Sequence, residues 1–164
     1  MSTMLLFPGQ GAQAVGMGQD LAAGLPECRA LFAQASEVLG YDLLKLCAEG
    51  PIEELTKSHQ AQPAIFVVSQ AARIALAHAL GGKLAVAGTA GHSLGEWAAL
   101  HEAGVISFAD AVRVLRARGQ FMQEACEATP GGMLTLIGLP LDKVQEVAQA
   151  SGLEVANLNS PVQT

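Results

Sequence analysis

The sequence predicts an α/β fold, and three stretches of the chain carry this prediction. A short apolar strand pattern over residues 4–7 ends at a glycine-rich turn, Pro8-Gly9-Gln10-Gly11. A long, alanine-rich helical pattern begins at Gln62-Pro63 and ends at Gly81-Gly82. A second strand pattern over residues 84–90 leads through Gly91-His92-Ser93-Leu94-Gly95 into another helical pattern. Strands that alternate with helices in this order are typical of α/β domains.

The composition narrows the class of protein further. With 164 residues, of which 51% are apolar and only 15% are charged, the chain can bury one core of ordinary size. The net charge of −6 argues against a nucleic-acid partner, which would favour a basic patch. No apolar run approaches the roughly 20 residues that a membrane helix needs, and the N-terminus lacks the basic region of a signal peptide. We therefore expect neither nucleic acid nor a membrane as a partner.

The cysteines indicate the compartment. Cys28, Cys47 and Cys126 are odd in number, far apart and in no metal-ligand spacing. We expect them to be reduced and mostly buried thiols in a cytoplasmic protein, and we expect no metal site.

Helices are predicted over most of the chain between the two strands. The apolar spacing over residues 20–39 favours helices interrupted near Pro26 and ended by Gly40. Short helices are expected over residues 43–48 and 52–57. The long helix that follows is expected to have Pro63 at its first helical position, where the missing N–H of proline costs nothing.

A Gly-x-Ser-x-Gly motif between a strand and a helix is the pattern of a nucleophile elbow, in which a tight turn pushes the serine out of the sheet. Ser93 is therefore the candidate nucleophile. The backbone N–H of Leu94, at the positive end of the next helix, would point toward an oxyanion. Glu96 suits the first helical turn for the same dipole reason and needs no chemical role. The alternative is a glycine-bracketed turn whose serine only caps a helix.

The next helix is predicted to begin at a capping box, Ser107 with Asp110, and to run to about Glu127. One face of this helix carries an apolar stripe that includes a cation: Ala111, Leu115, Arg118 and Met122. The other polar side chains of the helix are interpreted as solvated: Arg113, Arg116 and Gln120.

Arg118 needs a partner because a half-buried guanidinium is stable only beside an acceptor, and it can give a carboxylate two parallel hydrogen bonds. One interpretation is structural, with Arg118 paired to an internal Asp or Glu or reaching to solvent. The other is that Arg118 binds the carboxylate of a ligand.

The chain changes character after Thr129-Pro130-Gly131-Gly132. A strand is predicted over residues 133–137, a helix opened by Pro140 and a second strand over residues 153–158. We therefore expect a large domain over residues 1–129 and a small βαβ unit over residues 130–164.

A catalytic serine requires a base, usually a histidine within hydrogen-bond reach. His92 is adjacent to Ser93, so the two side chains diverge, and His101 lies two helical turns away, roughly 12 Å at ~1.5 Å per residue. His59 and His78 could approach only through an unusual topology. The base is therefore expected to lie outside these residues.

Several motifs in order give the chain a family resemblance: Phe7-Pro8-Gly9-Gln10-Gly11, Gln62-Pro63-Ala64, Gly91-His92-Ser93-Leu94-Gly95-Glu96, Arg118-Gly119 and Asn157-Leu158-Asn159-Ser160-Pro161. With these, the chain resembles the malonyl-CoA:acyl carrier protein transacylases. The resemblance spans the whole chain but only about the first half of that family's length.

This resemblance implies a role for each candidate residue. Ser93 would take the malonyl group as an ester, Gln10 and Leu94 would give backbone N–H groups to the oxyanion hole, and Arg118 would bind the malonyl carboxylate. His92 would lie beside the nucleophile in the substrate site, and the catalytic base would be a later histidine that these residues lack.

The resemblance also implies fold and partners. The fold would be an α/β-hydrolase-like body followed by the start of a ferredoxin-like small subdomain. The activity would move malonyl from coenzyme A to the phosphopantetheine thiol of an acyl carrier protein in fatty acid biosynthesis, with a coenzyme A thioester as substrate and no further cofactor.

Two alternatives stay open. The first is a serine esterase or thioesterase that uses the same elbow, which Arg118 argues against because a neutral ester gives a guanidinium nothing to bind. The second is a truncated, non-catalytic module that binds an acyl carrier, which the absence of a well-placed base favours.

Overall fold

The computed structural model describes residues 3–129 and 131–164 and has a mixed α/β fold with a small parallel sheet. Its contacts divide the chain into two compact units, one ending at Ala128 and the other beginning at Thr129. The first unit contains both strands and most of the helices, so it positions the candidate site.

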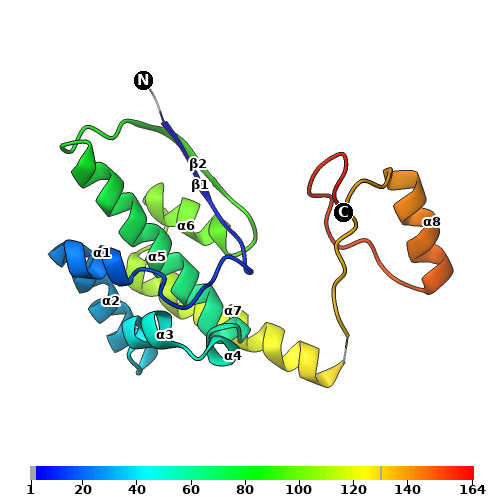
Figure 1. Ribbon diagram of the computed structural model, residues 1–164, viewed down its shortest axis with the longest axis horizontal. Helices are drawn as coiled ribbons and strands as arrows, with labels where there is room; N and C mark the ends of the chain where they lie inside the picture. Colours follow the sequence, from blue (N-terminus) through cyan, green and yellow to red (C-terminus); the bar gives the residue numbers. More distant parts are fainter. Residues whose placement is uncertain (1–2, 130) are drawn as a thin grey trace. The chain divides into compact units, whose positions relative to one another are not determined.

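The sheet of the first unit pairs β1 (Thr3–Phe7) with β2 (Val86–Gly91) in parallel (Figure 1). Phe7 lies opposite Gly91, so both strands end at the same edge of the sheet. The chain stays paired just beyond this point, where the His92 N–H donates to the Phe7 carbonyl at 3.1 Å. The glycine-rich turn after β1 and the Ser93 turn after β2 therefore leave the sheet side by side.

The first four helices after β1 agree with the sequence-based prediction. α1 covers Gln19–Gly24 and α2 covers Pro26–Leu39, with Gly40 ending α2 in the left-handed conformation that glycine tolerates best. α3 (Leu43–Glu49) starts at Asp42, whose carboxylate accepts from the Lys45 N–H, and α4 (Ile52–Leu55) is one short turn.

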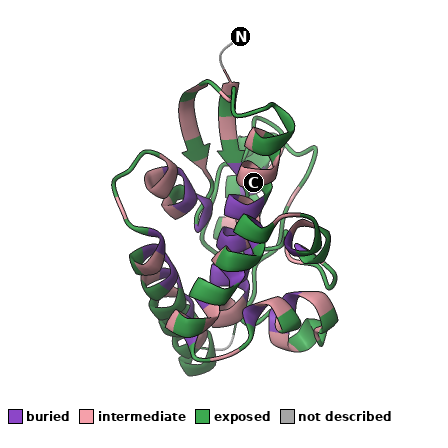
Figure 2. Cartoon of the chain, turned by 90° about the vertical axis from the view of Figure 1, so that its left-hand side faces the viewer, coloured by how far each residue is buried: buried purple, intermediate pink, exposed green. Residues whose placement is uncertain are grey.

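The long helix α5 (Ser58–Ala79) begins earlier than predicted, and Pro63 lies inside it. The expectation that Pro63 opens the helix was wrong, although an internal proline removes one helical hydrogen bond. Packing explains the difference, because residues 61–67 are all buried and their burial outweighs this local cost (Figure 2). None of the helices in the described residues is long and apolar enough to cross a membrane.

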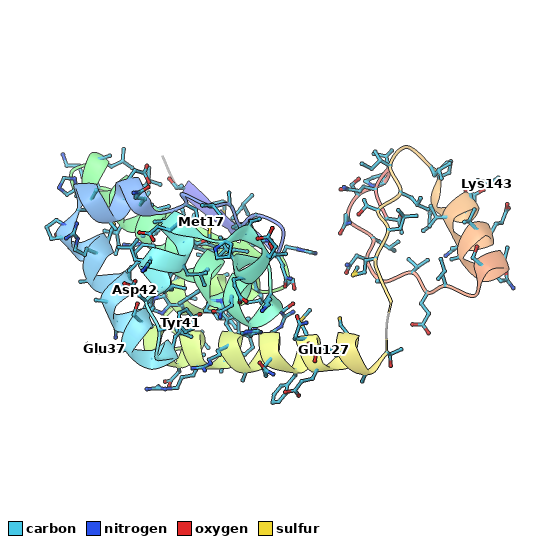
Figure 3. All side chains as sticks on the ribbon, turned by 60° about the horizontal axis from the view of Figure 1, so that its bottom comes forward. Met17, Glu37, Tyr41, Asp42, Glu127 and Lys143 are labelled. Atoms are coloured by element: carbon cyan, nitrogen blue, oxygen red, sulfur yellow. The ribbon has the colours of Figure 1, made fainter. Side chains whose placement is uncertain are left out.

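The core of the first unit lies between α5, α2, α6 (Gly95–Glu102) and α7 (Phe108–Ala128). α7, which reaches past Glu127 in Figure 3, starts at the predicted capping box. The Ser107 hydroxyl accepts from the Asp110 N–H at 3.1 Å and donates to its carboxylate at 2.6 Å. This bond, together with Arg113, holds the pKa of Asp110 below its usual range.

Arg116 is exposed, as interpreted from the sequence, and it also has a partner on another helix. Its Nη1 donates to the Leu39 carbonyl at 2.5 Å, at the C-terminal end of α2. A cation there satisfies a carbonyl that the helix leaves without a partner. The side-chain partners found for Arg113 and Gln120 in the described part of the chain lie on their own helix: Asp110 and Glu124, respectively.

The second unit contains α8 (Leu141–Ser151), which starts after Pro140 as predicted. The two predicted strands are not formed over residues 131–164, so that prediction was wrong for these segments. Instead the Leu136 and Thr164 backbones bond to each other, and Ile137 forms an antiparallel bridge with Gln163. Met133 and Leu153, 79% and 62% exposed, show the reason: no sheet buries the apolar side chains that a stable strand needs.

Candidate active site

The Ser93 turn has the strained geometry of a nucleophile elbow. Ser93 has φ of 55°, the one positive φ recorded for a non-glycine residue in residues 3–129 and 131–164. A Cβ on Gly91 would lie 2.0 Å from the Gly95 carbonyl oxygen. A Cβ on Gly95 would lie 2.4 Å from the Phe7 carbonyl oxygen. The two glycines therefore let the turn close on itself and against the end of β1, and the serine is left exposed.

The loop after β1 contacts the elbow. A Cβ on Gly9 would lie 2.6 Å from His92 Nδ1, so the His92 ring lies directly against this loop. Within the described residues, no backbone acceptor is recorded for the amides of Gln10 and Leu94. Two free amides on adjacent loops are the kind of donors that can stabilise an oxyanion.

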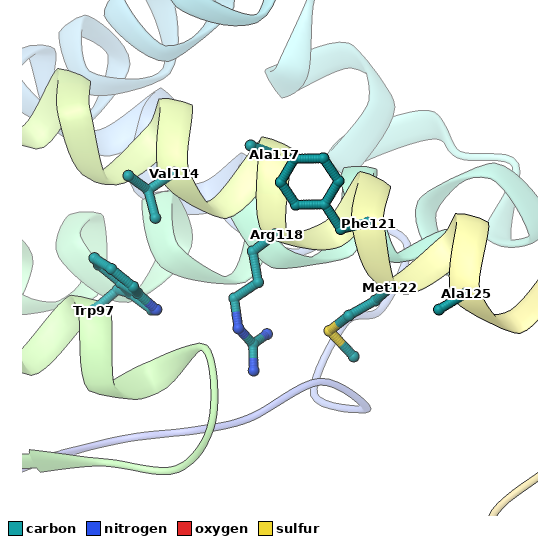
Figure 4. A pocket seen from close by; sticks show the side chains of 7 residues that line it. All are labelled: Trp97, Val114, Ala117, Arg118, Phe121, Met122 and Ala125. Carbon is teal, nitrogen blue, oxygen red and sulfur yellow. The ribbon is translucent and has the colours of Figure 1, made fainter.

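Arg118 reaches Ser93 from α7. Its Nη2 donates to the Ser93 hydroxyl at 2.9 Å and its Nη1 donates to Gln62 Oε1 at 2.7 Å. No salt bridge recorded among the described residues includes Arg118, which rules out the internal Asp or Glu partner within that part of the chain. Figure 4 shows the guanidinium extending away from α7 between Trp97 and Met122.

The predicted stripe of α7 is buried only in its first half. Ala111 and Leu115 are fully buried, whereas Met122, one turn after Arg118, is 39% exposed. Arg118 therefore lies where α7 leaves the core. An open groove of about 540 Å³ follows this part of the helix, and its lining is mainly apolar: Trp97, Val114, Ala117, Arg118, Phe121, Met122 and Ala125.

Two side-chain amides, those of Gln62 and Gln10, form a hydrogen-bonded series that ends at Arg118 Nη1. Gln62 Nε2 donates to Gln10 Oε1 at 3.4 Å and to the Met122 sulfur at 3.2 Å, and Gln10 Nε2 donates to the Ser58 hydroxyl at 3.1 Å. The sequence-based prediction did not assign Gln62 a place in the site. A signal was present, because a glutamine in a nearly all-apolar helix stretch requires buried partners.

No hydrogen bond between a histidine and the Ser93 hydroxyl is recorded among the described residues. His101 Nδ1 lies 2.9 Å from the Ile106 carbonyl, and its ring packs edge-on against Phe66 and Phe108. It therefore has a structural place at the end of α6. His92 lies against the Gly9 loop, as described above, and Ser93 Oγ has Arg118 as its recorded partner.

A serine with positive φ between a parallel strand and a helix is the arrangement typical of a nucleophile elbow, and such turns carry the nucleophiles of many acyl-transfer enzymes. Comparison with known families agrees, since residues 4–164 match the acyl transferase domain. The chain belongs to the acyl transferase domain family.

Individual relatives are named more specifically. The chain is 49% identical over 163 residues to a malonyl CoA-acyl carrier protein transacylase of Escherichia coli O157:H7, which covers 96% of this chain and 52% of that relative. It is 47% identical over 142 residues to the mitochondrial malonyl-CoA-acyl carrier protein transacylase of Homo sapiens, covering 86% of this chain and 36% of that relative. The chain thus spans about half the length, or less, of these curated relatives.

The solved structures that the chain resembles are also malonyl transacylases. A malonyl CoA-acyl carrier protein transacylase from Coxiella burnetii superposes with a TM-score of 0.89 at 40% identity, covering 100% of this chain and 52% of that one. A malonyl-transacylase in complex with its type II polyketide acyl carrier protein superposes with a TM-score of 0.84 at 43% identity, covering 99% and 53%. The fold of the chain is therefore that of about half a malonyltransferase.

Proposed function

We propose that this chain carries the nucleophile and the acyl-binding cation of a malonyl-CoA:acyl carrier protein transacylase. The observation that carries the proposal is the 2.9 Å hydrogen bond from Arg118 Nη2 to the Ser93 hydroxyl. An acyl group on Ser93 Oγ would extend from the atom that the guanidinium already contacts. A guanidinium there favours an acyl group that ends in a carboxylate.

The reaction would proceed in two acyl transfers. Ser93 Oγ attacks the thioester carbonyl of malonyl-CoA, its proton passes to a base, and the resulting oxyanion accepts hydrogen bonds from the Gln10 and Leu94 amides. The C–S bond then breaks, coenzyme A leaves as its thiol and malonyl remains as an ester on Ser93. The phosphopantetheine thiol of an acyl carrier protein then gives its proton to the base and attacks this ester. The new C–S bond forms, the C–O bond to Ser93 breaks, and the base returns the proton to Ser93 Oγ, which leaves malonyl on the carrier as a thioester.

The charge of the acyl group decides which thioester is used. Arg118 would bind the malonyl carboxylate through Nη1 and Nη2, and the Ser93 hydroxyl would release its bond to Nη2 as it reacts. His92, on the loop side of the elbow, would contact the substrate without acting as the base. The base would be a group other than the four histidines of this chain. In support, His101 Nδ1 lies 2.9 Å from the Ile106 carbonyl, and no hydrogen bond from the other three histidines to Ser93 is recorded within the described segments.

The finer features of fold and setting follow from the same family. We assign residues 1–129 to an α/β-hydrolase-like body and residues 130–164 to the start of a ferredoxin-like subdomain. The coenzyme A thioester would be the only nucleotide-bearing group, and no separate cofactor is required. Malonyl-CoA and an acyl carrier protein would be the partners, in the cytoplasm, where the buried thiols Cys28 and Cys47 would stay reduced.

An esterase or thioesterase is the competing function, because it would use the same serine turn. Arg118 disfavours it, because this cation has no salt-bridge partner in the part of the chain that the structure describes, and release of a neutral acyl group to water gains nothing from a guanidinium at the nucleophile. A non-catalytic carrier-binding module would not need the backbone strain recorded at Ser93.

The first test is the covalent intermediate. Incubation with malonyl-CoA should add one malonyl mass to Ser93, and the label should transfer to an acyl carrier protein rather than to water. Ser93→Ala should give no adduct. Labelling that persists in Ser93→Ala would reject Ser93 as the nucleophile. Release of malonyl to water without transfer to the carrier would favour the esterase.

The second test is the cation. Arg118→Ala should reduce the stabilisation of the bound malonyl group by roughly 2–5 kcal/mol, because a charge-assisted pair is lost. The relative use of acetyl-CoA should therefore rise. Competition between the two thioesters for Ser93 measures this ratio. Arg113→Ala, on the same helix but paired with exposed Asp110, is the matched control and should leave the ratio unchanged. Equal losses for both thioesters in Arg118→Ala would make Arg118 structural.

A further inference from the structure

Gln62 is a buried polar side chain that lies between Arg118 and the loop after β1. It is 0% exposed, on the buried stretch of α5, and its amide joins Arg118 of α7 to Gln10 of the loop after β1. A buried amide in an apolar helix is costly unless all its groups are bonded. Its three partners, Arg118, Gln10 and Met122, satisfy this requirement.

The orientation of the Gln62 amide is fixed by its neighbours. A guanidinium has only donors, so the atom 2.7 Å from Arg118 Nη1 must be the oxygen Oε1. The nitrogen Nε2 then faces Gln10 Oε1, which turns the Gln10 amide nitrogen toward Ser58. Exchange of Oε1 and Nε2 in the Gln62 amide would place its N–H donors against the N–H donors of Arg118 Nη1. The amide therefore holds Nη1 in one place, and Nη2 remains aimed at Ser93.

The amide is also neutral, which matters for the charge of Arg118. A carboxylate at this position could form a bidentate ion pair with the guanidinium and cancel its charge. A neutral acceptor orients the guanidinium and leaves the positive charge for another group. No carboxylate among the described residues forms a salt bridge with Arg118, so the charge stays uncompensated there.

We infer that Gln62 is a positioning residue for acyl selection: it orients Arg118 toward Ser93 while keeping the guanidinium charge available to the carboxylate of the acyl group. This inference rests on the proposed function. Gln62 acts through Arg118 and takes no part in bond making or breaking.

Close helix packing keeps the two residues in register. A Cβ on Gly119 would lie 2.4 Å from the Ser58 carbonyl oxygen and 2.6 Å from His59 Cα. α7 therefore touches the first turn of α5 immediately after Arg118. That contact lies one helical turn before Gln62, so the guanidinium and the amide meet without an intervening side chain.

The test compares two substitutions with opposite consequences. Gln62→Glu keeps the shape of the side chain but adds a charge, whereas Gln62→Met keeps the volume and removes the acceptor. Gln70→Met is the matched control, because Gln70 is also a buried glutamine of α5, and its amide bonds to the Ala98 carbonyl instead of Arg118. The readout is the ratio of malonyl to acetyl adduct on Ser93 when both thioesters compete.

The ratio should fall about a hundredfold in Gln62→Glu, because the incoming carboxylate meets a neutralised cation and a like charge. It should fall about tenfold in Gln62→Met, where the cation remains but one charge-assisted hydrogen bond is lost. Gln70→Met should leave it unchanged. A merely structural role predicts that malonyl and acetyl adducts fall equally, so that the ratio stays at the wild-type value in Gln62→Glu and in Gln62→Met, and that result would overturn the inference.

A second readout needs no acylation. NMR signals of the Arg118 guanidinium should show restricted rotation in the wild-type chain, faster rotation in Gln62→Met and restricted rotation in Gln62→Glu. If wild type gives no Ser93 adduct with either thioester, the proposed function fails and these signals alone decide the positioning role. Arg118 signals that are unchanged in Gln62→Met would overturn it.

Discussion

Ser93 is held in the left-handed backbone region, with φ of 55°, which costs a residue with a Cβ roughly 1–2 kcal/mol. Glycine adopts this conformation without that cost. We therefore expect Ser93→Gly to be more stable than Ser93→Ala by about 1 kcal/mol in the free energy of unfolding, with no malonyl adduct in either. Chemical denaturation measures the difference.

Ser93→Ala is the control because both variants lose the hydroxyl and its bond to Arg118. The comparison therefore isolates the backbone term. Equal stability of the two variants would mean that the turn relaxes when the hydroxyl is removed. The hydrogen bond between Ser93 and Arg118 would then be what holds Ser93 at positive φ.

At the residue scale, most of the candidate site could be predicted from the sequence, for reasons that differ between residues. Ser93 and Leu94 follow from a local motif, and Arg118 follows from a cation at an apolar helix position. Gln10 came from family resemblance, since a loop amide has no periodic signal. Gln62 was not identified because its role depends on α7 lying beside α5, and helix pairing cannot be deduced from the pattern of either helix alone.

Between elements, Gly119 sets the approach of α7 to α5. An alanine Cβ would lie 2.4 Å from the Ser58 carbonyl oxygen and close to the His59 backbone, and backbone atoms cannot move aside cheaply. We expect Gly119→Ala to destabilise the chain by about 1–3 kcal/mol and to lower the malonyl-to-acetyl ratio, because Arg118 moves with the helix. Denaturation and thioester competition measure the two effects.

Gln120→Ala is the control for this contact. Gln120 is exposed on the same helix and its amide donates to Glu124, so its loss should change stability by less than about 0.5 kcal/mol. A Gly119→Ala variant as stable as Gln120→Ala would show that the two helices can separate without cost.

Another prediction concerns α3 and its buried thiol. Burial raises the pKa of Cys47 from 9.0 to about 12 and also raises that of Cys28 in α2. A group whose pKa is higher in the folded state stabilises the fold fully below its unfolded pKa and loses this effect as the pH rises through the folded value. The free energy of unfolding should therefore fall between about pH 9 and pH 12.

Unfolding curves at several pH values check this dependence. Cys47→Ala should be less stable at neutral pH but should show a shallower fall with pH, whereas Cys126→Ser should keep the wild-type slope because Cys126 is exposed. Identical slopes in all three proteins would exclude Cys47 as a source. Tyr41, whose pKa burial also raises, would then account for the fall.

Element prediction succeeded where local signals and burial agree. The capping box at Ser107 and the glycine stop at Gly40 were both confirmed. It failed at Pro63, where buried packing carries a helix through a proline, and over residues 133–137 and 153–158. Those two segments have strand-like composition, but a strand forms only beside other strands that complete a sheet. The composition of a segment does not show whether such neighbours are present.

At the scale of the whole molecule, the two units differ in how much core they have. The buried apolar cluster draws its members from Phe7 to Leu115, all in the first unit, whereas Val144 is the buried apolar side chain described in the second. We expect a chain ended at Ala128 to keep a cooperative thermal transition within a few degrees of the full chain. Residues 129–164 alone should show none.

Calorimetry of the two fragments and the full chain tests this division. The first fragment should also keep the restrained Arg118 guanidinium, since Ser93, Gln62 and Arg118 all lie before Ala128. Loss of cooperative unfolding in that fragment would show that the second unit stabilises the first.

The parallel pairing of β1 with β2 also has a kinetic consequence. Five helices, α1 to α5, separate the two strands in the sequence, so the edge that carries both Gln10 and Ser93 closes one long loop of chain. Closure of a long loop is slow because its entropy is lost before the contacts form. On a ribosome, α1 to α5 would emerge before β2, and α6 and α7 would emerge after it. The chain would therefore acquire its reactive serine geometry only after the five helices that separate the two strands have been made.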